Sequence, residues 1–379
     1  MPMKNIRILF AIQTLFGLSA IGMTRDISTN NPNIIYSPYN WVRGADYAQT
    51  PNPGAYFKLG FTGTSITVNI DATTLARANV PAAQYPLIRT TVDGGPGTVI
   101  QLKAGLQTID CAVDLKPGNH TLKVEYVAGY VFLDFWTPVN VLKFTSFTID
   151  DHANTTRLKP LARNILFLGD SITNGDDNVA NFKDGITNTV QTQDATIGYP
   201  SVVAKASGAE YGVVAYGGAS WDNTAADGHT PGLMTFWSMI DKEHSRLIET
   251  RDGRGLHPKF SPIPDEIYVN MGENRPPTPD QVYEIIDALA KASSFKTNIF
   301  IIVPFSGRAR QPILRGYVRI AESYGRVPNI YLIDLGDNPY LPDNGPTKLS
   351  VDGQHPLAAL HALLGDQIVK ERARLMAKK

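Results

Sequence analysis

Apolar and polar residues alternate in short runs along the first part of the chain, up to about residue 150. In the segment 64–70 (TSITVNI), apolar residues occupy every second position. Similar runs lie at 87–92, 121–126 and 142–149, and turn sequences such as DGGPG at 93–97 separate them. Because such alternation places apolar side chains on one face of a strand, these runs predict β-strands. No helical pattern accompanies them, so we expect a β-sandwich of jelly-roll type over residues 28–155.

From residue 164 onward, buried-strand patterns alternate with helical ones. Five apolar runs predict strands at 165–168, 212–216, 266–270, 298–303 and 330–334. The clearest helical pattern starts at Thr278, where Pro279 and Gln281 complete a capping box. Its apolar positions, spaced for one helix face, are Val282, Ile285, Ile286 and Leu289. This alternation predicts a doubly wound, five-stranded parallel sheet over residues 160–379, with ligands at the carboxyl ends of its strands.

The amino-terminal residues have the pattern of a signal peptide. Lys4 and Arg7 precede a run without charges from residue 8 to residue 22, and Ala20-Ile21-Gly22 offers small residues for cleavage. We therefore expect residues 1–22 to be a signal peptide and the protein to be secreted or periplasmic, with no membrane span after its removal. The alternative is an amino-terminal anchor that is never cleaved.

Composition excludes several classes of function. Lys plus Arg and Asp plus Glu number 35 each among 379 residues. No basic field can therefore hold a phosphate backbone, and nucleic acid is not an expected partner. The single cysteine, Cys111, allows neither an intrachain disulfide nor a thiolate metal cluster. Dinucleotide, P-loop, zinc-protease and G-x-S-x-G motifs are all absent. We expect no metal and no organic cofactor, and we interpret the acidic segment 176–178 as a solvated loop rather than a cation site.

Candidate chemistry begins directly after the first strand of the predicted parallel sheet. Ser171 stands there in the sequence Gly-Asp-Ser-Ile, at the end of the sheet where ligands bind. Asp352 precedes His355 by three residues in a loop before the last helix. An aspartate at this spacing can accept the Nδ1 proton and leave Nε2 facing a serine. Together the three residues predict a catalytic triad. The alternatives are a serine and an aspartate that merely cap helices.

Two further strand ends carry candidate oxyanion donors. Gly218 follows the second strand and can bring a backbone N–H close to a substrate oxygen. Asn274 follows the third strand and offers a side-chain amide. With the N–H of Ser171 itself, they predict an oxyanion hole, although such residues also occur in ordinary turns. Trp221 and Arg275 are candidate substrate contacts, and core packing is the alternative for Trp221.

These motifs resemble the SGNH/GDSL hydrolase family over residues 160–379. The first block of the family is similar to ILFLGDSITNG at 165–175, which implies Ser171 as the nucleophile. The second is similar to VVAYGGAS at 213–220, the third to Gly-Glu-Asn-Arg at 272–275, and the last to Asp-x-x-His at 352–355. With a β-rich segment placed before it, the chain also resembles the two-domain carbohydrate esterases of family 2. Members of that family remove acetyl groups from plant polysaccharides.

The sequence departs from the family pattern at a few positions. Arg275 stands where the family usually has aspartate, and Glu273 replaces a common threonine or small residue. A different alignment makes Ser220 rather than Gly218 the oxyanion donor, again through its backbone N–H. Some family-2 esterases orient the histidine with a backbone carbonyl, so the need for Asp352 stays open.

The resemblance implies a secreted serine esterase that removes acetyl groups from a polysaccharide or oligosaccharide. Ser171 is the expected nucleophile, His355 the base and Asp352 its orienting partner. Two alternatives remain open at this point. One is a lipase or lysophospholipase that uses the same site, and the other is a carbohydrate-binding protein whose catalytic site has decayed.

Overall fold

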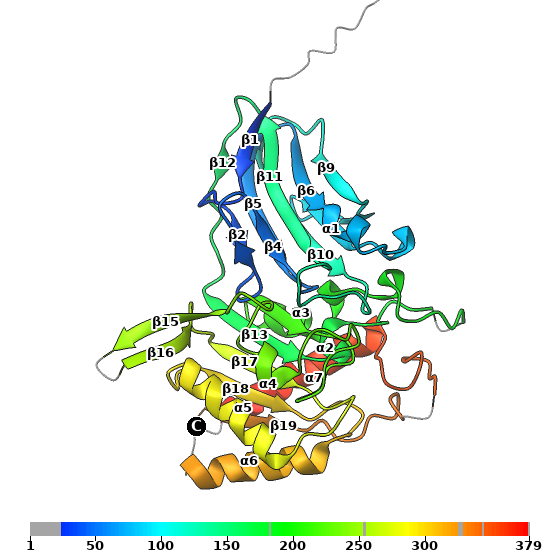
Figure 1. Cartoon of the computed structure of the whole chain (residues 1–379), viewed down its shortest axis with the longest axis vertical. Helices are drawn as coiled ribbons and strands as arrows, with labels where there is room; N and C mark the ends of the chain where they lie inside the picture. The colour runs from blue at the N-terminus through cyan, green and yellow to red at the C-terminus, as the bar shows by residue number, and fades with distance from the viewer. Residues whose placement is uncertain (1–23, 182, 253–254, 325–328, 343–344, 378–379) are drawn as a thin grey trace, which may run out of the picture.

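The computed structural model describes residues 24–377, except residues 182, 253–254, 325–328 and 343–344. The expected signal peptide of residues 1–22 lies outside the described residues. Figure 1 shows an antiparallel β-rich part, drawn in blue to green, above a part in which helices flank a parallel sheet. None of the described helices combines the length and the hydropathy that a bilayer span requires.

Two antiparallel sheets form the first part of the chain. One sheet has the order β3 (Val42–Arg43), β4 (Ala48–Thr50), β11 (Leu142–Asp150), β6 (Ile66–Ala72), β9 (Gly105–Ala112), and β1 (Thr24–Ser28) also pairs with β11. The other has the order β12 (Thr155–Thr156), β5 (Tyr56–Gly63), β10 (Gly118–Ala128), β7 (Leu87–Val92), β8 (Thr98–Gln101), and β2 (Ile35–Tyr36) also pairs with β5. The short helices α1 (Thr73–Arg77) and η1 (Ala82–Gln84) lie between strands.

The two antiparallel sheets share one hydrophobic core. Along β6 every second side chain is buried, as the alternation in the sequence predicts, and Ile66, Val68 and Ile70 all enter this core. The facing sheet contributes Phe57, Leu59 and Phe61 of β5 and Leu122, Val124 and Tyr126 of β10. The polar positions of β6 instead form cross-strand contacts, since the Asn69 amide donates to Ser146 and Thr148 on β11. This is the arrangement of a β-sandwich.

The second part is built on a five-stranded parallel sheet, as the sequence predicts. Its order is β14 (Ala209–Ala215), β13 (Arg163–Gly169), β17 (Glu266–Asn270), β18 (Asn298–Ile302), β19 (Ile330–Ile333). On one face, Ile165 and Phe167 pack with α3 (Tyr199–Ala206) and α7 (Ala358–Met376). On the other, Leu166 and Leu168 share a core with α5 (Pro279–Ala292) and α6 (Arg310–Tyr324). Helices on both faces make the sheet doubly wound.

Helix α5 begins with the capping box expected from its sequence. The backbone N–H of Gln281 donates to Thr278 Oγ1 at 3.2 Å, and the backbone N–H of Thr278 donates to Gln281 Oε1 at 2.8 Å. These two bonds satisfy donors that would otherwise be unpaired at the first turn. The apolar positions of the predicted face are all buried, namely Val282, Ile285, Ile286 and Leu289.

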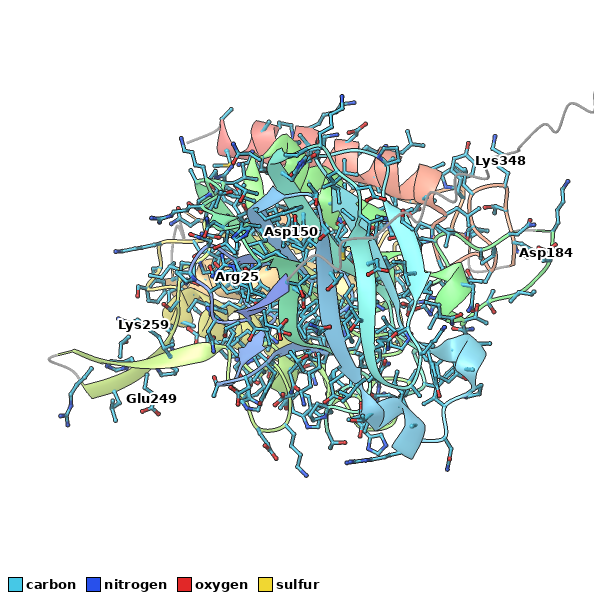
Figure 2. All side chains as sticks on the ribbon, turned by 90° about the horizontal axis from the view of Figure 1, so that it is seen from above. Arg25, Asp150, Asp184, Glu249, Lys259 and Lys348 are labelled. Carbon is cyan, nitrogen blue, oxygen red and sulfur yellow. The ribbon has the colours of Figure 1, made fainter. Side chains whose placement is uncertain are left out.

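The long connection between β14 and β17 contains structure that its sequence did not indicate. It forms the short helix α4 (Leu233–Phe236) and a two-stranded antiparallel hairpin, β15 (Leu247–Asp252) and β16 (Gly255–Phe260). Figure 2 shows this hairpin extending away from the body of the protein, with Glu249 and Lys259 on it.

Polar contacts join the antiparallel part to the parallel sheet. Glu210 on β14 accepts hydrogen bonds from Tyr56 Oη at 2.5 Å and from Lys58 Nζ at 2.7 Å, both on β5. The Asn52 amide donates to Tyr216 Oη at 2.8 Å. Because Glu210 and Asn52 are both buried, these contacts fix the orientation of one part against the other.

Candidate active site

Ser171 lies at the carboxyl end of β13, the second strand in the order of the parallel sheet. It is the first residue of the short helix α2 (Ser171–Asn174), and the Asp170 side chain caps that helix by accepting a hydrogen bond from the backbone N–H of Ile172 at 3.2 Å. Gly175 ends the helix in the left-handed conformation, with φ of 78°. The tight turn holds the backbone of Ser171 at the carboxyl edge of the sheet, as the sequence predicts.

Asp352 and His355 form a hydrogen-bonded pair in the loop before α7. The carboxylate oxygen Oδ2 of Asp352 lies 2.5 Å from His355 Nδ1. The other oxygen, Oδ1, accepts the backbone N–H groups of Gln354 at 2.9 Å and His355 at 2.8 Å. The backbone thus fixes the carboxylate, and the carboxylate fixes the proton on Nδ1. When the imidazole is neutral, Nε2 is then the acceptor, the form that a general base needs.

The charge of His355 acts on the carboxylates on either side of Ser171. Burial raises the pKa of Asp170 to about 7, and the nearby positive charge of His355 acts in the opposite direction. Burial also raises the pKa of Asp176 to about 7, again opposed by His355. Since these two aspartates flank the Ser171 helix in the sequence, the charge of His355 acts on both sides of the serine turn.

The pKa of His355 itself is raised. Burial by itself lowers it, but the hydrogen bond and the charge of Asp352, together with the charges of Asp176 and Asp177, raise it to about 9. Conversely, the bond and the charge of His355 outweigh burial and hold the pKa of Asp352 well below its usual range. The pair is therefore poised as imidazolium and carboxylate near neutral pH.

The two loops that carry the candidate oxyanion donors lie against each other. The Asn274 side-chain amide donates to the backbone oxygen of Ala219 at 2.9 Å. Gly218 has φ of 76°, and a Cβ on it would lie 2.8 Å from the backbone nitrogen of Ala226. Only glycine fits this turn without a shift. The backbone N–H of Glu273 in turn donates to Asp170 Oδ2 at 3.3 Å, which ties the third strand end to the serine turn.

The structure separates the two candidate substrate contacts. Trp221 is 1% exposed, belongs to the core between the sheet and α5, and donates from its indole nitrogen to the backbone oxygen of Met271 at 3.2 Å. This favours the core alternative for Trp221. Arg275 is exposed, and its guanidinium donates to the Asn223 side-chain oxygen at 2.6 Å. It therefore bridges two loops at the rim of the site.

The expectation of a solvated loop at residues 176–178 is wrong. Asp176, Asp177 and Asn178 are all at most 2% exposed. Asn178 exchanges hydrogen bonds with the backbone of Asp194 at 2.8 Å in each direction, and its own backbone oxygen accepts from Ala358 at the start of α7. Residues far along the chain cover this acidic segment, so nothing in its local sequence indicated burial.

One group of side chains is close enough together to surround a cation. Single ligand atoms of Asp177, Asp352 and His355 lie within 4.8 Å of one another. The contact between Asp352 and His355 Nδ1 is, however, that of a charge-assisted hydrogen bond. We therefore interpret the group as a hydrogen-bonded charge cluster and assign no metal to it.

Comparison with known proteins identifies the fold. No model of a known protein family matches the chain. An acetylxylan esterase/glucomannan deacetylase of Cellvibrio japonicus is 26% identical over 241 residues, which is 61% of this chain and 63% of that protein. The match thus spans less than two thirds of the relative.

Solved structures cover nearly the whole chain. A family two carbohydrate esterase from Cellvibrio japonicus matches with a TM-score of 0.74 and 17% identity, over 94% of this chain and 99% of the other. An acetyl xylan esterase from Butyrivibrio proteoclasticus matches with a TM-score of 0.72 and 15% identity, over the same shares, 94% and 99%. A family two carbohydrate esterase from Clostridium thermocellum, in complex with cellohexaose, matches with a TM-score of 0.69 and 18% identity, over 89% and 97%. The resemblance indicated by the motifs is confirmed for the fold: the chain has the fold of the family two carbohydrate esterases.

Proposed function

We propose that this protein is a serine esterase that removes acetyl groups from a carbohydrate. The observation that carries the proposal is the hydrogen-bonded Asp352–His355 pair, whose charge acts on Asp170, the residue before Ser171 at the carboxyl edge of the sheet. The fold shared with family two carbohydrate esterases supports it. A nucleophile, a base and an orienting carboxylate in this order are sufficient for acyl transfer.

In the proposed reaction, Ser171 Oγ attacks the acetyl carbonyl carbon while His355 Nε2 accepts the hydroxyl proton. The backbone N–H groups of Ser171 and Gly218 and the amide of Asn274 donate hydrogen bonds to the resulting oxyanion. The C–O bond to the sugar then breaks, and His355 returns the proton to the departing hydroxyl. Water, deprotonated by the same imidazole, attacks the acetyl-enzyme and releases acetate and free Ser171.

The relatives indicate the class of substrate. The curated relative is named for acetylxylan and glucomannan, and one solved relative is bound to cellohexaose. We therefore propose acetylated xylan or glucomannan, or oligosaccharides derived from them, as substrates. The test is release of acetate from acetylated xylan, glucomannan and pectin by the purified protein, with Ser171→Ala as control. If neither protein releases acetate, the proposed esterase activity is contradicted, and a carbohydrate-binding protein with a decayed catalytic site is the alternative.

We also infer the organisation of the mature protein. In our proposal it is secreted or periplasmic, residues 28–155 form an accessory domain, and residues 160–379 form the hydrolase domain. Nested strand pairs support a jelly-roll accessory domain, since β4 pairs with β11, β5 with β10, β6 with β9 and β7 with β8. Eight strands in two such sheets are the jelly-roll arrangement.

The pH dependence of the esterase follows from the state of His355. The base accepts the Ser171 proton only when it is neutral, and its pKa is raised to about 9. We expect kcat/KM for p-nitrophenyl acetate to rise with pH and to level off near this pKa. The measurement covers about pH 6 to pH 10, and the rate of the uncatalysed reaction is subtracted at each pH. A profile that is flat above pH 6.5, the ordinary pKa of histidine, would contradict this charge cluster.

Acyl-chain preference separates the deacetylase from a lipase. The exposed residues beside the site, Asn274 and Arg275, are polar and offer little to a hydrocarbon chain. A lipase pocket gains about 0.8 kcal/mol for each buried methylene, whereas a small acyl pocket excludes longer chains. We expect kcat/KM to fall steeply from p-nitrophenyl acetate to butyrate and to be negligible for octanoate. A maximum at octanoate or longer would favour the lipase alternative.

A further inference from the structure

Asp177 is a buried carboxylate that the proposed reaction does not use. It is 1% exposed, and its backbone has a φ of 55°, in the left-handed region that aspartate and asparagine tolerate better than most residues. Its oxygen Oδ1 accepts the backbone N–H of Asn188 at 2.6 Å and the hydroxyl of Thr192 at 2.7 Å. Its other oxygen, Oδ2, is buried without a hydrogen-bond partner among the residues that the structure describes.

The carboxylate of Asp177 lies beside the catalytic pair. One of its oxygens, one oxygen of Asp352 and one ring nitrogen of His355 all lie within 4.8 Å of one another. Since Oδ1 already accepts two hydrogen bonds, Oδ2 is the oxygen that is free to face the imidazole. An unpaired carboxylate is costly to bury, and a nearby cation offsets that cost. Protonated His355 is such a cation.

We propose that Asp177 is a second carboxylate that positions His355 and stabilises its protonated form beside Asp352. The inference deepens the proposed esterase function and rests on it. In the transition state, the imidazole carries the proton taken from Ser171, so a second negative charge stabilises that state as well as the protonated free enzyme. Asp177 acts through His355 and does not touch the substrate, which makes it a positioning residue.

Other ionisable groups also face the imidazole, and their roles differ. The groups whose charges interact with His355 are Asp352 in its own loop, Asp170, Asp176 and Asp177 around α2, and His361 on α7. Asp176 also contacts the serine turn, because its Oδ1 accepts from the Asn174 amide at 2.6 Å, and its Oδ2 lies 2.4 Å from where a Cβ on Gly217 would be. Burial keeps His361 neutral by lowering its pKa to about 3. Among the described residues, Asp177 is the carboxylate that has an oxygen within 4.8 Å of both Asp352 and His355.

The Asp177→Asn variant should change the pH profile in two opposite ways. Loss of one negative charge destabilises the imidazolium, so the apparent pKa of kcat/KM should fall by about one unit. The same loss should lower the plateau at high pH several-fold, because the transition state also contains the imidazolium. The variant is therefore less active than the wild type at high pH. As the pH is lowered, its kcat/KM falls by a smaller factor than that of the wild type. A residue with a purely structural role would lower activity equally at all pH values.

The double variant tests whether the two carboxylates share one task. Asp352→Asn leaves Asp177 as the remaining anionic partner of His355. We expect Asp177→Asn to reduce kcat at least about tenfold more in the Asp352→Asn background than in the wild type. Independent, multiplicative losses would contradict a shared role.

Two control variants separate loss of the Asp177 charge from an effect on folding. Asp184→Asn is the matched variant, because Asp184 is an exposed aspartate of the same loop and should leave the profile unchanged. Asparagine tolerates the backbone conformation of residue 177, and Asp177→Gly removes the carboxylate while suiting the positive φ even better. All assays contain EDTA.

An NMR titration provides a readout without substrate. The His355 resonance, assigned by its loss in His355→Gln, should titrate at lower pH in Asp177→Asn than in the wild type. If wild type and Ser171→Ala are equally inactive, the esterase proposal fails, and the titration still tests the contact. An unchanged pKa of His355 in both Asp177 variants would overturn the inference.

Discussion

Ser171→Ala and His355→Ala should each lower kcat by about 10⁴-fold or more, and the double variant should lower it little further. The two groups act in one proton transfer, so removing either one disables the other. The remaining activity comes from binding and from the oxyanion donors. Measured kcat for p-nitrophenyl acetate in the two single variants and the double variant checks the prediction.

The chain provides its own control for this experiment. Asp241 and His244 repeat the Asp-x-x-His spacing, and His244 Nδ1 lies 2.7 Å from Asp241 Oδ1, much as His355 contacts Asp352. This second pair follows α4 in the long connection rather than a strand of the parallel sheet. His244→Ala should therefore keep wild-type kcat. Substantial turnover by Ser171→Ala or His355→Ala, with unchanged circular dichroism, would refute the assigned roles.

Replacing Asn274 with alanine should lower kcat by about 10²–10³-fold and change KM little. One N–H of its amide donates to the backbone oxygen of Ala219 at 2.9 Å, and this bond restrains the amide next to the loop of Gly218. A donor fixed in advance stabilises the oxyanion more than the ground-state carbonyl, which is why the loss falls on kcat.

A neighbouring asparagine serves as the comparison. The side chain of Asn223 is exposed and accepts the Arg275 guanidinium instead of contacting the oxyanion loop backbone. Asn223→Ala should stay within about threefold of wild-type kcat, since it removes no oxyanion donor. If Asn274→Ala is no worse than Asn223→Ala, then Asn274 does not contact the oxyanion.

The elements whose formation depends on neighbouring residues could be predicted from the local sequence pattern. The alternation in residues 66–70 and the helical spacing after Thr278 each assign apolar side chains to one face, and both elements formed as predicted. The five strands of the parallel sheet were predicted from continuous apolar runs, because helices cover both faces of such a sheet. Ser171 and the loop of His355 could be placed at strand ends because an open sheet gathers the carboxyl ends of its strands at one edge.

The folded arrangement of the loops determines which polar residues are buried and which partners they meet. Both Asp-x-x-His segments, at 241–244 and 352–355, form an aspartate–histidine contact, and the second acts on the aspartates that flank Ser171. The segment 176–178 has the composition of a surface loop, yet Asn188, Thr192, Asp352 and His355 lie around Asp177. Burial and charge proximity depend on residues that lie far apart in the chain. Local pattern therefore predicted the framework, whereas the environment of His355, and with it the pKa of the base, arose only when the loops after different strands came together.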